Sequence, residues 1–146
     1  MSKVLGLIVL CLVAGTANAA LLSRLDGQAY YDDVSGLTWI ADANLAQTSG
    51  YDADGLLNWI DATNAWPASL AAASYLGVSD WRLPAASEYS ALYTQIVALG
   101  SPGPFLNLQT AYWSSTAIRC LIRQFCYGGF WNQTSFNFVT GAQGQP

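Results

Sequence analysis

The sequence predicts a single α+β domain, in which two helices pack on a sheet of short, mostly antiparallel strands. Apolar residues recur at helical spacing between residues 56 and 99, and short β-like segments with turn residues lie before and after that region. Helices and antiparallel strands in separate parts of a chain are typical of the α+β class. No internal repeat and no linker divides the sequence into two domains.

The first two predicted strands are Gln28–Asp32 and Leu37–Ala41, which are short and rich in aromatic and aliphatic residues. Asp33–Gly36 lies between them and consists mostly of turn-forming residues, so a turn is expected to connect the strands. Residues 42–55 are polar and contain several glycines, and we expect them to form a loop.

Two helices are expected next. The first has one amphipathic face, and Pro67 should kink or restart this helix because its ring nitrogen cannot donate to residue 63. The second begins after Pro84 and stops at Gly100. The residues expected on the buried faces are Leu56, Trp59, Thr63, Trp66 and Leu70 in the first helix, and Tyr89, Leu92, Tyr93, Ile96 and Leu99 in the second.

The C-terminal third is predicted to form short strands at Ala111–Ser115, Gln124–Trp131 and Ser135–Val139. In the last of these, Phe136 and Phe138 occupy alternate positions. Successive side chains of a strand point to opposite faces, so this strand should present one aromatic face.

The N-terminus predicts export. Lys3 precedes an apolar run over residues 4–13, and Ala17-Asn18-Ala19 places small residues at the spacing of a cleavage site. The run is about half the roughly 20 residues that a membrane span needs. We therefore expect residues 1–19 to be a signal peptide, residues 20–146 to be one domain without a membrane span, and the protein to be secreted, periplasmic or on the cell surface.

Composition excludes several classes of function. The formal net charge is −4, which argues against binding to nucleic acid or to anionic membrane surfaces. The chain has no histidine, so a Ser/His/Asp or Cys/His nucleophile system cannot form. Cys120 and Cys126 remain after signal cleavage, and in an oxidising compartment they are expected to form a disulfide.

A set of short motifs is spread over the chain from residue 36 to residue 116, and together they are specific. With these motifs the chain resembles the C-terminal domain of Lcl-type collagen-like adhesins, which also occurs alone in exported bacterial proteins of unknown function. The motifs are Gly36-Leu37-Thr38-Trp39, Asp42-Ala43-Asn44, Gly50-Tyr51-Asp52-Ala53-Asp54-Gly55, Asp80-Trp81-Arg82-Leu83-Pro84, Glu88, Gly103-Pro104-Phe105 and Tyr112-Trp113-Ser114-Ser115-Thr116.

The resemblance implies a C-type-lectin-like fold related to the formylglycine-generating enzymes, and a role in ligand binding or adhesion rather than catalysis. Ala85 stands where the family usually has threonine, so the helix after Pro84 lacks one half of a capping box unless Ser87 replaces it. Family members usually continue into one more apolar strand, which pairs with the first. The chain is therefore expected to lack its final closing strand, leaving the strand at Gln28–Tyr31 without a partner.

Several motif residues are expected to be structural. Asp80 and Arg82 are expected to form a charge pair that holds a strand end, with Trp81 between them. Trp39 and Trp113 are expected to lie in the core.

Calcium is a weaker possibility. Asp52-Ala53-Asp54-Gly55 is a short acidic turn, and Asp61 lies at the closing distance of a calcium loop. The alternative is a solvated turn at the start of the first helix.

The expected ligand surface is Tyr127, Phe130, Trp131 and Asn132, where two glycines precede bulky aromatic residues. The expected function is recognition of an extracellular glycan or protein without catalysis. One alternative is an oxidase-like enzyme of the formylglycine-generating type that uses the cysteine pair. The other is a structural surface protein with no specific ligand.

Overall fold

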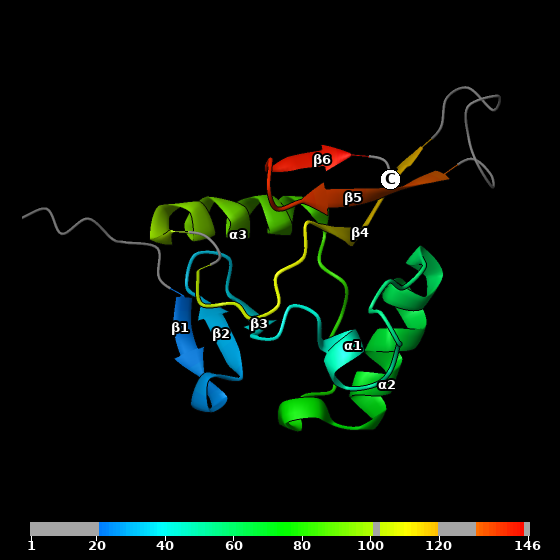
Figure 1. The fold of residues 1–146 in the computed structure, drawn as a ribbon, viewed down its shortest axis with the longest axis horizontal. Coiled ribbons are helices and arrows are strands. Elements are labelled where there is room, and N and C mark those ends of the chain that lie inside the picture. The colour runs from blue at the N-terminus through cyan, green and yellow to red at the C-terminus, as the bar shows by residue number, and fades with distance from the viewer. Residues whose placement is uncertain (1–20, 101–102, 120–130, 145–146) are drawn as a thin grey trace, which may run out of the picture.

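Three short strands form the first sheet of the computed structural model, which describes residues 21–100, 103–119 and 131–144 (Figure 1). The strands are β1 (Leu21–Arg24), β2 (Ala29–Asp32) and β3 (Leu37–Ile40), antiparallel and in the order β1-β2-β3. Both strands predicted for this region are confirmed. β1 was not predicted, and it occupies the second edge of β2. The expectation that the strand at Gln28–Tyr31 has no partner is therefore wrong.

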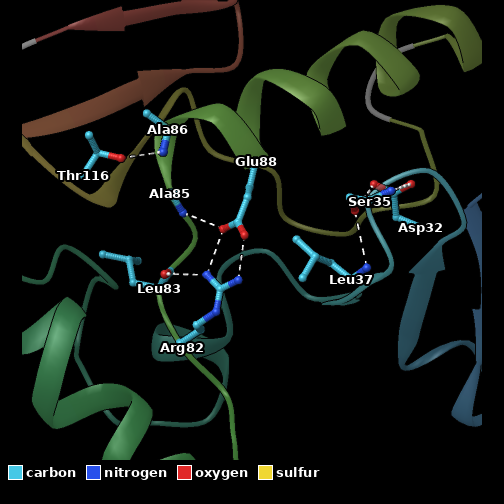
Figure 2. A network of polar contacts seen from close by, with 9 residues as sticks. All are labelled: Asp32, Ser35, Leu37, Arg82, Leu83, Ala85, Ala86, Glu88 and Thr116. Atoms are coloured by element: carbon cyan, nitrogen blue, oxygen red, sulfur yellow. Dashed lines mark hydrogen bonds and ion pairs between the residues drawn. The ribbon is translucent and has the colours of Figure 1, made fainter.

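A buried carboxylate holds the turn between β2 and β3 (Figure 2). Asp32 is fully buried, and its Oδ1 accepts hydrogen bonds from the amides of Val34 (2.9 Å) and Ser35 (3.2 Å). Its Oδ2 accepts a hydrogen bond of 2.6 Å from the Ser35 hydroxyl. An aspartate that caps its own turn in this way sets the register of the hairpin.

The first predicted helix is confirmed in part. A short helix α1 (Leu45–Thr48) precedes it, and the chain then forms a π-type turn (Asp61–Ala65) that continues into α2 (Trp66–Ala72). Pro67 lies at the start of α2, so the predicted restart is present. Leu56 lies before the helix with 77% of its surface exposed, so its expected burial is wrong.

The second predicted helix is confirmed as α3 (Ala86–Leu99), which ends at Gly100 with a φ of 86°. Three of its five expected core residues, Tyr89, Leu92 and Ile96, are buried, whereas Leu99 is 55% exposed. Leu99 is the last residue of α3.

The missing capping side chain at Ala85 is replaced from a distant strand. The amide of Ala86 donates to Thr116 Oγ1 at 3.0 Å, and the amide of Ala85 donates to Glu88 Oε2 at 2.7 Å (Figure 2). Two of the free amides at the helix start are thus satisfied, one of them by a threonine thirty residues away. Ser87 does not supply the cap.

The second sheet contains β4 (Ala111–Arg119), β5 (Trp131–Asn137) and β6 (Ala142–Gly144) in antiparallel order β4-β5-β6, with an irregularity between Trp113 and Ala117. The strand predicted at Ala111–Ser115 is confirmed and is longer. The strand predicted at Gln124–Trp131 lies, apart from Trp131, outside the described residues. Phe136 and Phe138 are both buried, as their alternation predicted.

Helix α3 lies between the two sheets and joins them into one core (Figure 1). The buried cluster takes Trp39 from β3, Phe105 from the segment after α3, and Phe136 from β5, around the apolar face of α3. Tyr89 of α3 contacts the ring of Trp39 at a centroid distance of 5.9 Å and that of Phe136 at 5.8 Å. The structure is thus an α+β domain with two small antiparallel sheets.

Candidate functional site

A cleft of about 580 Å³ opens between β3, α1, α2, the start of α3 and the beginning of β4. We call it the central cleft. Four tryptophans line it, Trp39, Trp66, Trp81 and Trp113, and most of the remaining lining is aliphatic or aromatic. A largely apolar cleft of this size matches the usual dimensions of a small-ligand or side-chain pocket.

The motifs by which the chain resembles its family converge on this cleft. Thr38 and Trp39, Asp42 to Asn44, Trp81 to Pro84, Phe105, and Tyr112 with Trp113 all contribute to its lining. These segments are far apart in the sequence, and the fold brings them to one place.

One wall is formed where the chain after β3 meets the segment after α3. Asp42 and Leu106 form a parallel bridge, in which the amide of Leu106 donates to Ala41 O and the amide of Ala43 donates to Leu106 O, both at 2.9 Å. Asp42 Oδ1 also accepts from the Asn107 side chain at 3.0 Å. The carboxylate therefore ties the two segments of this wall together.

Two reciprocal indole hydrogen bonds hold the opposite wall. The N–H of Trp113 donates to Leu57 O at 2.7 Å, and the N–H of Trp59 donates to Ser114 O at 2.8 Å. These two bonds connect β4 to the segment at the start of the π-type turn. The Trp113 ring is thus fixed at the cleft by a hydrogen bond to Leu57, which also lines the cleft.

Trp81 is also held by its indole nitrogen, which donates to Tyr75 O at 2.9 Å. The expected pair between Asp80 and Arg82 is absent, because Arg82 turns towards the first turn of α3. Its guanidinium makes a bidentate pair with Glu88, with N–O distances of 2.8 and 2.6 Å (Figure 2). The segment is also irregular rather than a strand end. A carboxylate at the third helical position lies close to the chain entering the helix, which explains the choice of partner.

The mouth of the cleft is bordered by a loop that closes on α1. Gly55 has a φ of +77°, and a Cβ there would lie 2.2 Å from Asn44 Oδ1, so only glycine fits this approach. The ring of Tyr51 contacts that of Trp66 in a tilted arrangement with centroids 4.5 Å apart, and Leu56 lines the cleft with 77% of its surface exposed. The sequence predicted a polar loop here with a possible calcium site, and did not predict that Gly55 and Leu56 line an apolar cleft.

The titratable groups of the cleft have pKa values far from neutrality. Burial raises the pKa of Tyr89, and mainly burial raises the pKa of Tyr112 to about 12. Burial would also raise the pKa of Asp42, but hydrogen bonds from Thr48, Asn107 and the Asn44 amide outweigh it and lower the pKa. At neutral pH the cleft therefore holds one ionised, fully engaged carboxylate and neutral phenols.

The predicted acidic residues do not converge. Asp52 Oδ1 accepts from the amides of Asp54 (3.1 Å) and Gly55 (2.8 Å), and Asp61 Oδ2 accepts from the Asn58 side chain at 2.5 Å. Within residues 21–100, 103–119 and 131–144, no group of three or more acidic or cysteine side chains is placed to hold a metal. The calcium hypothesis thus remains a prediction without a formed set of ligands.

Only the backbone of Trp131 and Asn132 is described for the predicted ligand surface. Tyr127 and Phe130, like Cys120 and Cys126, lie outside the described residues. Trp131 and Asn132 begin β5, opposite Arg119 and Ile118 of β4, whereas the cleft touches the other end of this strand pair at Ala111 to Trp113. Trp39, Trp81 and Trp113, predicted to be structural, line the cleft, and Trp39 is also part of the buried core.

The hydrogen bonds to Asp42 predict an acid-sensitive stability. The pKa of Asp42 is lower in the folded protein than in the unfolded chain, where it is about 3.9. Its contribution to the free energy of unfolding is therefore fully present at pH values above the unfolded pKa and is lost as the pH falls through the folded pKa. Urea unfolding should show a nearly constant stability from pH 7 to pH 5 and a decline below about pH 4. Asp42→Asn should be less stable at pH 7 and should show a shallower decline. An exposed control, Asp80→Asn, should follow the wild type, and an identical pH profile for Asp42→Asn would contradict the assignment.

The fold and the cleft define a class: a small α+β domain with a tryptophan-lined cleft between two antiparallel sheets. The family model described as the Lcl C-terminal domain matches residues 28–143, and the chain belongs to this family. No curated protein and no solved structure matches the chain. Among the described residues, no helix is long and apolar enough to span a membrane.

Proposed function

We propose that this protein is an exported, non-catalytic binding module and that the central cleft is its binding site. The ligand is an extracellular glycan or protein. The observation that carries the proposal is the convergence of four tryptophans from separate segments on one open cleft of about 580 Å³. Large aromatic side chains supply much of the affinity in protein recognition sites.

The fixed orientation of the tryptophans supports binding. Trp81 and Trp113 each donate the indole N–H to a backbone carbonyl of a neighbouring segment. A ring held in this way loses little conformational freedom when a ligand packs against it, so less of the interaction energy is lost on association.

The titration behaviour of the cleft supports a role without catalysis. General acid–base chemistry works best with a group whose pKa lies near the operating pH. Asp42 has a lowered pKa and three hydrogen-bond donors, while Tyr112 has a pKa of about 12. Neither group is suited to exchange a proton with a ligand at neutral pH.

Export, a C-type-lectin-like architecture and adhesion belong to the same proposal. They rest on the apolar N-terminal segment and on the family to which residues 28–143 belong. A surface formed by Tyr127, Phe130, Trp131 and Asn132 remains a second candidate for the binding site.

Arrays of glycans and extracellular matrix proteins, probed with and without calcium, test the proposal. Leu56→Lys places a charge at the mouth of the cleft, at a side chain that is already 77% exposed and therefore tolerant of change. We expect this variant to lose about tenfold or more in capture, as expected for a charge at the edge of an apolar contact. Trp131→Ala is the matched control at the other surface.

The outcomes separate the candidates. Loss of capture in Trp131→Ala with no loss in Leu56→Lys would move the site to the end of β5. Failure of the wild type to bind any array component would favour a structural protein without a specific ligand.

A further inference from the structure

We infer that the ligand of the central cleft is an extended polypeptide segment that adds a strand to the edge of β3 and inserts apolar side chains into the cleft. This inference rests on the proposed function, since it names the class of ligand for the same site. It follows from the backbone of β3, from the polar groups of the lining, and from the exposed side chains at the mouth.

Within the described residues β3 is an edge strand whose outer side faces the cleft, and just beyond it Asp42 bridges to Leu106. In the described sheet it pairs with β2 alone. Thr38, Trp39 and Ile40 all line the cleft, although successive side chains of a strand point to opposite faces. A cavity that touches three consecutive residues therefore runs along the edge of the strand rather than over one face.

The register shows which backbone groups are directed to that edge. The amide of Ala41 donates to Gln28 O at 3.0 Å, as in a hydrogen-bonded pair, although the Gln28 amide donates to Leu25 O instead of returning the bond. Such pairs alternate along antiparallel strands, so Trp39 pairs with Tyr30 in the same manner. The backbone groups of Thr38 and Ile40 consequently point away from β2, towards an incoming strand.

The polar lining disfavours a glycan. The charged and amide side chains of the cleft already hold partners within the protein. Arg82 is paired with Glu88, the Asn44 amide donates to Gln47 Oε1 at 2.7 Å, and the Gln109 amide donates to Asn107 O at 2.9 Å. The buried Trp39 N–H, which has no hydrogen-bond partner among the described residues, is one free donor. A sugar with several buried hydroxyls would need more partners, and each unpaired hydroxyl would lower the affinity several-fold.

An extended peptide matches what remains. Its backbone satisfies Thr38 and Ile40, and its alternate side chains enter a tryptophan-lined cavity, which is the usual division of roles in strand addition. Leu56 and Tyr51, which are 77% and 40% exposed, extend the apolar surface beyond the mouth. The net charge of −4 favours basic rather than acidic residues at the ends of the segment.

The test uses an array of seven-residue peptides that carry Val, Ile, Leu, Phe, Tyr or Trp at positions two, four and six, threonine at positions three and five, and lysine at both ends. Thr38→Pro removes the outward amide and leaves the hydrogen bonds of Trp39 to β2 in place, and proline is found on edge strands where the missing amide faces outward. Thr38→Val is the matched control, because it changes the side chain and retains the amide. We expect Thr38→Pro to weaken binding of the best peptide about tenfold and Thr38→Val to leave it within about threefold.

Amide hydrogen exchange supplies a second measurement at the residues concerned. In the free protein the Trp39 amide should exchange slowly, while Thr38 and Ile40 should exchange faster because their amides do not pair with β2. Binding of the best peptide should slow Thr38 and Ile40 about tenfold or more and leave Trp39 unchanged. N-methylation of alternate peptide amides should abolish this protection.

Each other result decides against the inference in a distinguishable way. Equal peptide binding by the wild type and Thr38→Pro would overturn strand addition and leave the cleft as the binding site. The same conclusion would follow if the protein captured glycans but no peptides, and if Leu56→Lys abolished that capture. Protection of Thr38 and Ile40 that rises with protein concentration alone would assign the edge to a second copy. Binding unaffected by Leu56→Lys would overturn the proposed site itself.

Discussion

Replacing Phe136 with alanine is expected to lower the free energy of unfolding by about 3–5 kcal/mol, the range for truncation of buried aromatic residues. Phe136 has no exposed surface and sits among the rings of Tyr89, Tyr93 and Phe138, with centroid distances of 5.8, 5.9 and 5.0 Å. Its removal leaves a cavity where α3 meets β5. Urea denaturation measures the change, and the midpoint should shift while the slope is retained.

Val139→Ala is the matched control for this change. Val139 follows the same strand but is 70% exposed, so its truncation should alter stability by no more than about 0.5 kcal/mol. Phe136→Leu should fall between the two variants, because it retains much of the buried volume. A loss below about 1 kcal/mol for Phe136→Ala would show that the aromatic cluster is not a packed core.

The parts of the fold that depend on neighbouring residues could be predicted from the sequence. The hairpin of β2 and β3 is determined by a four-residue turn, and Asp32 caps that turn through bonds to residues two and three positions away. The apolar spacing of α3 likewise determines its buried face over most of its length. Phe136 and Phe138 share a face because the period of a strand is two.

The missed elements depend on contacts between distant residues. β1 has three exposed residues out of four, so no apolar alternation indicates a strand, and pairing with β2 alone defines it. Asp80 is only two residues from Arg82 in the sequence, yet the guanidinium pairs with Glu88 of the first turn of α3 at 2.6 Å. The cap at Ala86 comes from Thr116, which no local pattern could predict.

The cleft was beyond prediction for the same reason. Trp39, Trp81 and Trp113 were each recognised as important, and were expected to be structural. The sequence contains no information on the distance between their segments. Only the fold shows that the three rings surround a common opening, and that the hydrogen bonds of Trp81 and Trp113 hold their rings at its wall.

Trp113→Ala is expected to lower the free energy of unfolding by about 3 kcal/mol, near the lower end of the range for large truncations because the side chain is only partly buried. The change removes the ring from the cleft wall and leaves Leu57 O without the donor that lies 2.7 Å away. Because β4 and the segment at residues 57–59 are joined by this bond and by that of Trp59, the opposite wall should loosen. Ligand capture should decline together with stability.

Trp113→Phe separates packing from hydrogen bonding, since it retains an aromatic ring and loses the donor. It should cost about 1 kcal/mol, the usual net value of one hydrogen bond, as should Trp59→Phe. If the two indole bonds act together to hold one wall, the double variant should lose less than the sum of the single losses, because the first change already releases the segment that the second bond holds. Strictly additive losses of stability would mean that the two hydrogen bonds are independent. The position of the wall would then depend on the packing of Leu57 and Trp113 rather than on the paired hydrogen bonds.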